Sequence, residues 1–431
     1  MSELKRTQLY NAHLAAGATM VDFGGWDMPI QYPSGIVAEH LYTRKCCGIF
    51  DVSHMGRLLI EGPERLKFLQ HVLTSNAAAL TLNKAQYCII PNENGGAVDD
   101  AYLYQFEEDR YLLVVNASNT DKDLAWFEPI VKNYDCKIRN ISGETISIAV
   151  QGPESGKILA KLAGVEEVTE PARNNLSILD MEGHKVWVAR TGYTGEPIGY
   201  EIFLKNEDAD WIWNRLMELG AKPAGLGARD TLRMEAMLPL YGDEMGIDEE
   251  GNEMPIFGLA LARFAVSFDE CKGDFIGRKA LEKQAAAQTA FREKRGTEAD
   301  LVDLPKRVRP IALKDRGVMR HGMEVFYQGE KVGYVTSATM IPYYKTEGEG
   351  AEAKLLEETG KRAIGIAFIR SDIPTNAEVE VDVRGKRLKA VIPLKHVSNN
   401  VPPNVIPVIA QRSACLNADS PIQTNQRSIY F

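Results

Sequence analysis

Residues 92–104 read Asn-Glu-Asn-Gly-Gly-Ala-Val-Asp-Asp-Ala-Tyr-Leu-Tyr. The Asn-Glu-Asn-Gly-Gly run favours a tight reversal, and the alternating residues behind it predict a strand. Because side chains alternate across a strand, Asp99 and Asp100 are expected to point to opposite faces, one of them inward. An inward carboxylate costs free energy unless a partner compensates it, so the pair indicates a functional site. The alternative is that both aspartates cap the turn and face water.

The composition bounds the class of protein. The chain has 431 residues, 45% of them hydrophobic and 25% charged, which suits a soluble protein of two or three domains. The net charge of -9 and the lack of a Lys/Arg-dense run argue against nucleic-acid or anionic-membrane partners. No apolar stretch is long enough to span a membrane, and residues 1–6 lack signal- or transit-peptide character. We expect a cytoplasmic protein and a monomer.

The cysteines and histidines give little support to metal chemistry. The six cysteines are scattered without a C-x-x-C spacing, and the seven histidines contain no H-x-x-x-H pair. This pattern predicts a reducing compartment and no metal site. His54 lies at the end of a predicted strand, and we interpret it as a packed, hydrogen-bonded core residue rather than a catalyst.

Two segments about ninety positions apart share one design. Residues 57–66 and 146–155 each run from a strand through Gly-Pro into an amphipathic helix, which predicts two related α+β units. Between them, residues 56–144 form a unit of their own, with strands expected over 86–90, 101–105 and 110–116 and a helix over 122–133.

The remainder of the chain divides into helices and a small all-β domain. Helices are expected over 36–45 and 208–219, a strand that carries Glu201 follows a glycine-rich reversal, and Arg229 and Arg233 share one helix face as i and i+4. Residues 282–304 predict a helix that runs into an exposed linker. Short strands are then expected over 308–313, 324–327, 331–337, 362–369, 377–383 and 388–393. We expect 346–360 to be a mobile loop and the tail from Ser398 to be extended or disordered.

Seven motifs occur in a fixed order along the chain. They are Met-Val-Asp-Phe-Gly-Gly-Trp-Asp-Met-Pro at 20–29, Phe-Asp-Val-Ser-His-Met at 50–55, Gly95-Gly96 with Asp99-Asp100, Gln-Gly-Pro at 151–153, Thr-Gly-Tyr-Thr-Gly-Glu at 191–196, Gly-Leu-Gly-Ala-Arg-Asp at 225–230 and Asp-Phe-Ile-Gly-Arg at 274–278. Together they cover the chain to about residue 395, and they resemble the aminomethyltransferase (T-protein) family of the glycine cleavage system. No nucleotide-binding G-x-G-x-x-G or P-loop motif competes with this interpretation.

The resemblance implies an α+β three-domain cloverleaf around a tetrahydrofolate channel. It implies transfer of a one-carbon unit from an aminomethyl group on a lipoylated carrier protein to tetrahydrofolate, with release of ammonia. With the sequence pattern, it gives residues 1–55 and 145–281 as a discontinuous folate-binding α+β domain, 56–144 as a ferredoxin-like α+β domain with Asp99 and Asp100, 282–304 as a helix and linker, 305–397 as a β-barrel and 398–431 as an extended tail.

The resemblance also implies roles for individual residues. Asp100 would be the catalytic acid beside the reacting folate nitrogens, Glu201 would bind the pterin, and Arg229 would be the basic residue of the folate region. Further residues would line the channel: Tyr87, Tyr104, Asn116, Met55 and Tyr193. Elementary chemistry agrees with these roles, since a carboxylate suits the N–H edge of a pterin, aromatic and thioether side chains suit its flat ring, and an arginine fork suits the carboxylates of the glutamate tail.

The reaction needs no nucleophile from the protein, because the attacking nitrogen belongs to the folate. This fits a chain without a convincing Ser/His/Asp or Cys/His set. The protein must supply orientation and a carboxylate that holds a proton and stabilises a cationic centre. Asp100 is the candidate for that role, and Asp99 is expected to be its structural partner.

The chain departs from the family pattern in several places. Pro197-Ile198 adds one residue before Gly199, residues 248–254 form a longer run, and the usual tryptophan is replaced by Phe264 or Arg263. Residues 336–343 read Thr-Ser-Ala-Thr-Met-Ile-Pro-Tyr and precede an insertion. Because these changes fall where a donor would approach, a tetrahydrofolate-dependent demethylase of a small O-, S- or N-methyl donor is the first alternative. A non-catalytic folate-binding protein is the second, although its typical Lys-Gly-Cys segment is absent.

Overall fold

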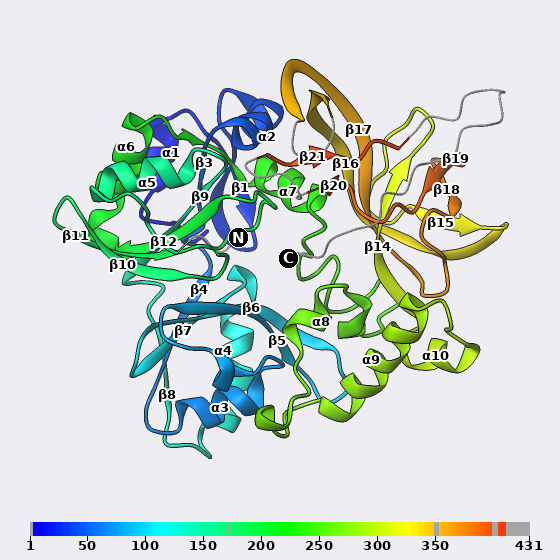
Figure 1. Ribbon diagram of the computed structural model, residues 1–431, viewed down its shortest axis with the longest axis horizontal. Coiled ribbons are helices and arrows are strands. Elements are labelled where there is room, and N and C mark those ends of the chain that lie inside the picture. Colours follow the sequence, from blue (N-terminus) through cyan, green and yellow to red (C-terminus); the bar gives the residue numbers. More distant parts are fainter. Residues whose placement is uncertain (1–2, 171, 349–352, 399–403, 411–431) are drawn as a thin grey trace.

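Three lobes surround the centre of the molecule in the computed structural model, which describes residues 3–170, 172–348, 353–398 and 404–410 (Figure 1). Two lobes each contain a mixed helix and sheet arrangement, and the third is a closed barrel. The predicted α+β class with a C-terminal barrel is confirmed. Among the described helices, none combines the length and the apolar character that a membrane crossing requires.

The first lobe is built on a six-stranded sheet of order β10-β11-β12-β9-β3-β13. Its strands are β3 Gly48–Asp51, β9 Thr145–Gln151, β10 Leu176–Met181, β11 His184–Ala189, β12 Gly199–Lys205 and β13 Lys222–Pro223. Its helices are α1 Tyr10–Ala15, α2 Gly35–Lys45, α5 Ser155–Ala163, α6 Ala209–Glu218 and α7 Leu226–Glu235, and a hairpin joins β1 Thr19–Phe23 to β2 Trp26–Gln31. The helices predicted over 36–45 and 208–219 are confirmed, as is the strand that carries Glu201.

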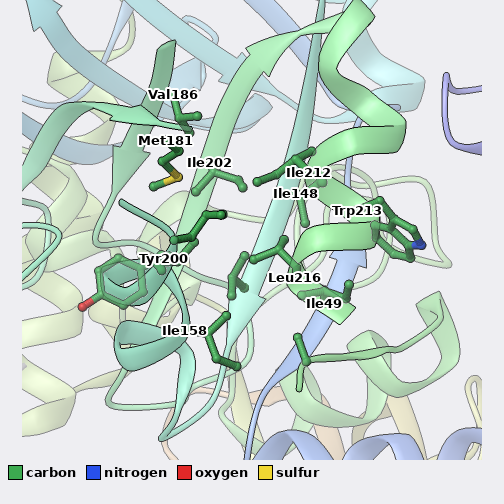
Figure 2. Packing of buried hydrophobic residues seen from close by; sticks show 14 of the residues in the cluster. Ile49, Ile148, Ile158, Met181, Val186, Tyr200, Ile202, Ile212, Trp213 and Leu216 are labelled. Atoms are coloured by element: carbon green, nitrogen blue, oxygen red, sulfur yellow. The ribbon is translucent and has the colours of Figure 1, made fainter. Parts of the chain in front are cut away.

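The core of this lobe lies between the sheet and helices α5 and α6. Figure 2 shows Ile212 and Leu216 of α6 beside Ile148 of β9 and Ile202 of β12, and all four side chains are fully buried. An amphipathic helix that covers one face of a sheet removes both apolar surfaces from water, so this packing stabilises the lobe that carries Glu201.

The second lobe is a five-stranded antiparallel sheet of order β5-β6-β7-β4-β8. Its strands are β4 Gly56–Glu61, β5 Lys84–Pro91, β6 Ala97–Glu107, β7 Arg110–Val115 and β8 Lys137–Asn140, and its helices are α3 Arg65–Val72 and α4 Thr120–Val131. The predicted strands and the predicted helix are confirmed. The sheet has one strand more than the four of a ferredoxin-like arrangement, because β5 is added at the edge beside β6.

The repeated Gly-Pro junction has a steric explanation. Gly62 and Gly152 follow β4 and β9 with φ angles of 113° and 123°, a region that L side chains rarely adopt. A Cβ atom on Gly152 would lie 2.4 Å from the carbonyl oxygens of Thr43 and Cys46, and one on Gly62 would lie 2.6 Å from the carbonyl oxygen of Asp135. The two related units therefore share a turn that only glycine permits.

The third lobe is a closed barrel of order β14-β17-β16-β15-β18-β19. Its strands are β14 Lys306–Leu313, β15 Glu324–Tyr327, β16 Glu330–Glu347, β17 Lys354–Arg370, β18 Glu378–Val383 and β19 Lys386–Val391. All six predicted strands are present. Strands β16 and β17 are much longer than expected, and they form the tall hairpin at the top of Figure 1.

The prediction of a mobile loop over 346–360 is wrong for most of that segment. Thr346 pairs with Leu355 in the β16–β17 hairpin, and Glu357 forms a 2.6 Å ion pair with Lys45 at the end of α2. The polar composition suggested a loop, but an exposed two-stranded ribbon satisfies its backbone hydrogen bonds internally and needs few apolar residues. Residues 349–352 lie outside the described chain.

Two further expectations at the ends of the barrel change. The predicted linker after helix α9 (Arg278–Arg292) contains a second helix, α10 (Glu298–Asp303), which begins with a capping box between Thr297 and Asp300. In the tail, β21 (Ile406–Pro407) is extended as expected but pairs with β20 (Val397–Ser398). The rest of the tail, 399–403 and 411–431, lies outside the described residues.

The segment from about 238 to 281 joins the second lobe to the barrel. It contributes the short helices η4 Ile256–Gly258, α8 Ala262–Ala265 and η5 Glu270–Lys272. Met254 and Phe257 of this segment share one buried cluster with Ile89 of β5 and Phe368 of β17. This segment therefore packs against both the second lobe and the barrel. The domain boundaries assigned from the sequence stay predictions.

Arg57 provides a test of how the first two lobes are joined. Its side chain is fully buried in β4 and donates to the carbonyl oxygens of Ser53, Met55, Ser142 and Thr145 at 2.7–3.0 Å. Burial lowers the pKa of Arg57 to about 10. We expect Arg57→Met to lower the free energy of unfolding by about 2–4 kcal/mol in urea titrations, because it leaves buried carbonyl groups without donors.

The matched control for this test is Arg139→Met. Arg139 is an exposed arginine that pairs with Glu144 on the surface, and its loss should change the free energy of unfolding by less than about 1 kcal/mol. Equal losses in the two variants would contradict the structural role assigned to Arg57.

Candidate active site

The reversal at residues 92–96 forms as predicted. The Asn92 side-chain oxygen accepts hydrogen bonds from the backbone N–H groups of Asn94 and Gly96, and the Asn92 N–H donates to the Gly96 carbonyl at 2.9 Å. The departure at 248–254 closes on the same turn, since the Asn92 amide donates to Glu253 at 2.6 Å. The turn therefore fixes the start of β6 from both sides.

Strand β6 directs its two aspartates to opposite faces, as the alternation predicted. Asp99 is fully buried on the side of helices α3 and α4, where Ala101 and Leu103 join the same apolar core. Asp100 is half-buried on the other side, which it shares with Tyr102 and Tyr104. The alternative in which both aspartates face water is wrong.

Asn116, at the end of β7, lies between the two carboxylates. Its side-chain nitrogen donates to Asp99 Oδ1 at 2.8 Å and to Asp100 Oδ1 at 2.7 Å, and its backbone N–H donates to Asp99 Oδ2 at 3.0 Å. The second oxygen of Asp100 accepts a hydrogen bond from the Tyr87 hydroxyl at 3.0 Å. Both side chains that contact Asp100 were predicted site residues.

Burial raises the pKa of Asp100 to about 7, and the negative charge of Asp99 adds to the effect. The hydrogen bonds from Asn116 and Tyr87 act in the opposite direction because they favour the ionised form. A carboxyl with this pKa can both hold and release a proton near neutral pH, which is what general acid–base chemistry requires.

Glu201 forms a second acidic position on β12. Its Oε2 atom accepts hydrogen bonds from the Tyr104 hydroxyl at 3.0 Å and from the Thr191 hydroxyl at 2.6 Å. Its Oε1 atom accepts no hydrogen bond from the part of the chain that the structure describes. Two donors thus fix the carboxylate and leave one oxygen available to a ligand.

Arg229, on α7, lies beside Glu201. Its guanidinium carbon is 5.0 Å from the centre of the Tyr193 ring, and its buried Nη1 atom has no hydrogen-bond partner among the described residues. Burial lowers the pKa of Arg229, while the charge of Glu201 opposes that shift. A buried, unsatisfied guanidinium nitrogen is costly unless a bound group accepts from it.

Tyr193 connects the acidic positions at Asp100 and Glu201. Its hydroxyl donates to the carbonyl of Pro239, and its pKa is raised by burial and, to a smaller extent, by the charge of Asp100. Tyr193 in turn contributes to the raised pKa of Tyr87. The structure therefore brings Asp100, Tyr87, Tyr193, Arg229 and Glu201 into one neighbourhood, although their sequence positions span 143 residues.

The other predicted residues have more varied environments. Met55 is half-buried and packs against the cluster that contains Ala228 and Leu232 of α7. Arg233, which was expected to share a face with Arg229, is instead enclosed by its own ion pairs with Glu244 at 2.7 Å and with Asp230 and Asp243. Arg233 therefore joins α7 to the barrel, where its guanidinium also donates to Ser337 at 2.9 Å.

Tyr102 lies on the same face of β6 as Asp100 and Tyr104, but it was not among the predicted site residues. It lies directly opposite Tyr87 across the β5–β6 ladder, with ring centroids 6.1 Å apart, and its ring is 5.3 Å from that of Tyr104. The signal was present in the sequence, since positions 100, 102 and 104 must share one face of a strand.

A separate cavity of about 240 Å³ lies at the junction of the first two lobes. It is lined by Lys5, Trp26, His54, Thr120 and Asn206, among others. His54 is packed as predicted, 4% exposed and 5.8 Å from Phe23 in ring centroids, and burial lowers its pKa to about 4. The expected hydrogen bond is not seen at Nδ1, which has no partner among the described residues. Within the described chain, no three His, Cys, Asp or Glu side chains are arranged to hold a metal ion.

Comparisons with known proteins give a consistent result. A family model described as the GCVT N-terminal domain matches residues 9–257. An aminomethyltransferase of Geobacillus kaustophilus is 40% identical over 397 residues, which are 91% of this chain and 98% of the relative. An aminomethyltransferase of Listeria monocytogenes serotype 4b is 40% identical over 395 residues, with 91% and 97% covered.

A solved structure shares the arrangement of the whole chain. The crystal structure of glycine cleavage system aminomethyltransferase T from Bartonella henselae matches with a TM-score of 0.73 and 28% identity. The match covers 90% of this chain and 97% of that one. The overall fold is therefore shared.

The raised pKa of Asp100 has a measurable effect on stability. The folded protein keeps the Asp100 proton up to about pH 7, whereas the unfolded chain releases it near its usual pKa. Between about pH 4 and 7 the native state therefore binds more protons, and its stability falls as the pH rises. Asp100→Asn removes this penalty. The free energy of unfolding of the variant minus that of wild type should therefore be about 1–3 kcal/mol larger at about pH 8 than at about pH 4.5.

Urea titrations at the two pH values measure this difference. The exposed carboxylate of Asp109 provides the control, and Asp109→Asn should show no comparable change with pH. A constant difference between Asp100→Asn and wild type at both pH values would contradict the assignment of a protonated Asp100.

Proposed function

This chain belongs to the aminomethyltransferase family, and on that premise we propose that it transfers a one-carbon unit from an aminomethyl-lipoyl carrier protein to tetrahydrofolate with release of ammonia. The observation that carries the proposal is the composition of the central site. Asp100 accepts a hydrogen bond from the Tyr87 hydroxyl, Glu201 accepts one from the Tyr104 hydroxyl, and the Tyr193 ring lies beside Arg229 and close enough to Asp100 to feel its charge. A flat, polar-edged ring such as a pterin is complementary to this arrangement.

Glu201 and Arg229 are proposed to hold the folate. The available Oε1 atom of Glu201 would accept an N–H bond from the aminopyrimidine edge, while Tyr104 and Thr191 keep the carboxylate in place. The unsatisfied Nη1 of Arg229 would donate to an acceptor on the same ligand. Because Arg229 is enclosed beside Glu201, we propose that it contacts the pterin end of the ligand rather than the glutamate tail.

Asp100 is proposed to manage the proton in the transfer. Tetrahydrofolate supplies the attacking nitrogen, so the protein must orient the reactants and accept a proton as the new bond forms. The carboxylate also stabilises the cationic centre that develops on the one-carbon unit. Asn116 and Tyr87 fix the orientation of the Asp100 carboxylate, because each of them donates a hydrogen bond to a different carboxylate oxygen.

The carrier protein and the cytoplasmic location are further parts of the proposal. The inserted residues Pro197-Ile198 lie in a loop that Arg190 and Arg173 hold through the carbonyls of Pro197, Gly199 and Glu196. That loop lies between Thr191 and Glu201 in the sequence. Its altered length therefore concerns donors that approach the Glu201 end of the site. The high coverage of relatives that share the aminomethyltransferase name favours the carrier over a small methyl donor.

Turnover with two donors tests the function. Purified protein and tetrahydrofolate are given an aminomethyl-loaded lipoyl carrier protein or a panel of small O-, S- and N-methyl compounds, and the folate products are identified by mass. We expect methylenetetrahydrofolate and ammonia from the carrier alone. Methyltetrahydrofolate from a small donor would establish the demethylase instead, and folate binding without either product would favour a binding-only protein.

The same assay tests Asp100. Asp100→Asn keeps the size of the side chain, and its amide can accept from Asn116 and donate to the Tyr87 hydroxyl, but it removes the titrating group, so we expect kcat to fall by about 100-fold or more. The dissociation constant for tetrahydrofolate should stay within about twofold, because Asp100 is not one of the groups proposed to hold the pterin. Unchanged turnover in this variant would refute the catalytic assignment.

Arg229→Ala tests the binding assignment separately. Loss of one charged hydrogen bond to the ligand should raise the dissociation constant for tetrahydrofolate by about tenfold or more in calorimetric titrations. Arg215→Ala is the control. Arg215 lies on α6 and forms exposed ion pairs with Glu182 and Glu218. An affinity that Arg229→Ala leaves intact would exclude Arg229 from the folate site.

A further inference from the structure

Asp123 is a buried carboxyl group that the proposed reaction does not explain. It lies in the first turn of α4, its side chain is fully buried, and neither carboxylate oxygen receives a hydrogen bond from a donor among the described residues. An ionised carboxylate in such a position would cost several kcal/mol. The group therefore requires either a counter-charge or a proton.

Asp123 forms no ion pair within the part of the chain that the structure describes. The charged groups that face it are Asp99 and Asp100 from β6 and Lys122 from its own helix. Lys122 is directed elsewhere, since its ammonium donates to the Val98 carbonyl and lies 3.9 Å from the centre of the Tyr241 ring. The negative charge of Asp99 acts on Asp123 more strongly than the positive charge of Lys122, and Asp100 adds to the effect of Asp99, so a proton is the remaining way to neutralise the group.

Asp99 provides the acceptor for that proton. Asn119, the N-cap of α4, and Asp123 lie one helical turn apart, and the Asn119 amide donates to Asp99, so the Asp123 carboxyl also faces Asp99, which is the charge that acts on it most strongly. Asp99 already accepts from the backbone and the amide of Asn116, and from the amide of Asn119 at 2.7 Å. Since two carboxylates in contact cannot both be ionised, one proton must lie between them.

We propose that Asp123 is a positioning residue for the one-carbon transfer, which holds a proton against Asp99 so that the buried pair carries one negative charge and keeps Asn116 directed at Asp100. The inference rests on the proposed catalytic role of Asp100. Its basis is geometric, because the Asn116 amide has two hydrogens and gives one to Asp99 and one to Asp100. A constant negative charge on Asp99 keeps one hydrogen of the Asn116 amide bound to Asp99. The other hydrogen of that amide then stays directed at Asp100.

The order of proton affinities agrees with this arrangement. Burial, followed by the charge of Asp99, raises the pKa of Asp123 to about 9, whereas Asp100 titrates at about 7. Asp123 therefore keeps its proton throughout the range in which Asp100 gains and loses one. If Asp123 were ionised, a third negative charge would draw the proton onto Asp100 and remove its ability to accept another.

Infrared difference spectroscopy on the full chain without substrates tests the proton directly. At about pH 8, where Asp100 is mostly ionised, wild type minus Asp123→Asn should show the C=O band of one protonated carboxylic acid. The band should disappear as the pH rises through about 9, and it should persist in Asp100→Asn. Absence of the band in wild type, or its persistence in Asp123→Asn, would overturn the proposal whatever the role of Asp100.

Turnover then tests the positioning role. In Asp123→Asn the amide can donate to Asp99 as the protonated acid does, so kcat should stay within about threefold of wild type. Asp123→Ala leaves Asp99 without this donor, and kcat should fall by about tenfold or more while the dissociation constant for tetrahydrofolate changes less than about twofold. Wild-type kcat in Asp123→Ala, or equal losses in both variants, would overturn the proposal. If instead Asp100→Asn retains turnover, the proposed function of the site fails while the infrared result stands.

Discussion

Two adjacent carboxylates on opposite faces of strand β6 are the constraint on which the site depends. Asp99 must be buried in the helix layer for Asp100 to reach the centre of the molecule, because neighbouring side chains on a strand cannot share a face. The burial of Asp99 is tolerated because Asn116 and Asn119 donate to it and Asp123 shares its proton. The charge that raises the pKa of Asp100 is therefore part of the fold of the second lobe.

Buried ion pairs hold the other lobes around this strand. Arg233 of α7 binds Glu244 and Ser337, which joins the first lobe to the barrel. Glu235, two residues further along α7, binds Arg44 of α2 and Arg362 of β17. Such pairs contribute less to stability than their Coulomb energy suggests, because both ions must be desolvated. Their directional hydrogen bonds do determine how the lobes are oriented, and α7 also carries Arg229 into the site.

The places where the chain departs from its family do not disturb the carboxylate cluster. The long β16–β17 hairpin rises from the barrel and is held to α2 by the Lys45–Glu357 ion pair, and Tyr344 of the same hairpin lies 5.8 Å from the Lys45 ammonium. The run at 248–254 closes on the turn at Asn92 instead of entering the site. Inserted segments thus lie outside strand β6 and helix α4, which keep the geometry of Asp99, Asp100 and Asp123.

The sequence by itself determined the features that arise from local sterics and periodicity. These include the turn at residues 92–96, the opposed directions of Asp99 and Asp100, the Gly-Pro junctions and the six strands of the barrel. Tyr102 follows from the same alternation. The family resemblance predicted roles for Glu201 and Arg229, but nothing in their sequence neighbourhoods shows that they adjoin each other.

Only the tertiary structure decided which groups share the site and how their protons are distributed. Glu201 and Arg229 meet because β12 pairs with β9 and α7 packs against Ala149 of β9, and Asp123 reaches Asp99 because α4 covers the far face of β6. On the sequence, Asp123 is an ordinary acidic residue in the first turn of a helix. Its protonation follows from desolvation and from a like charge in contact with it, and both depend on segments that fold together.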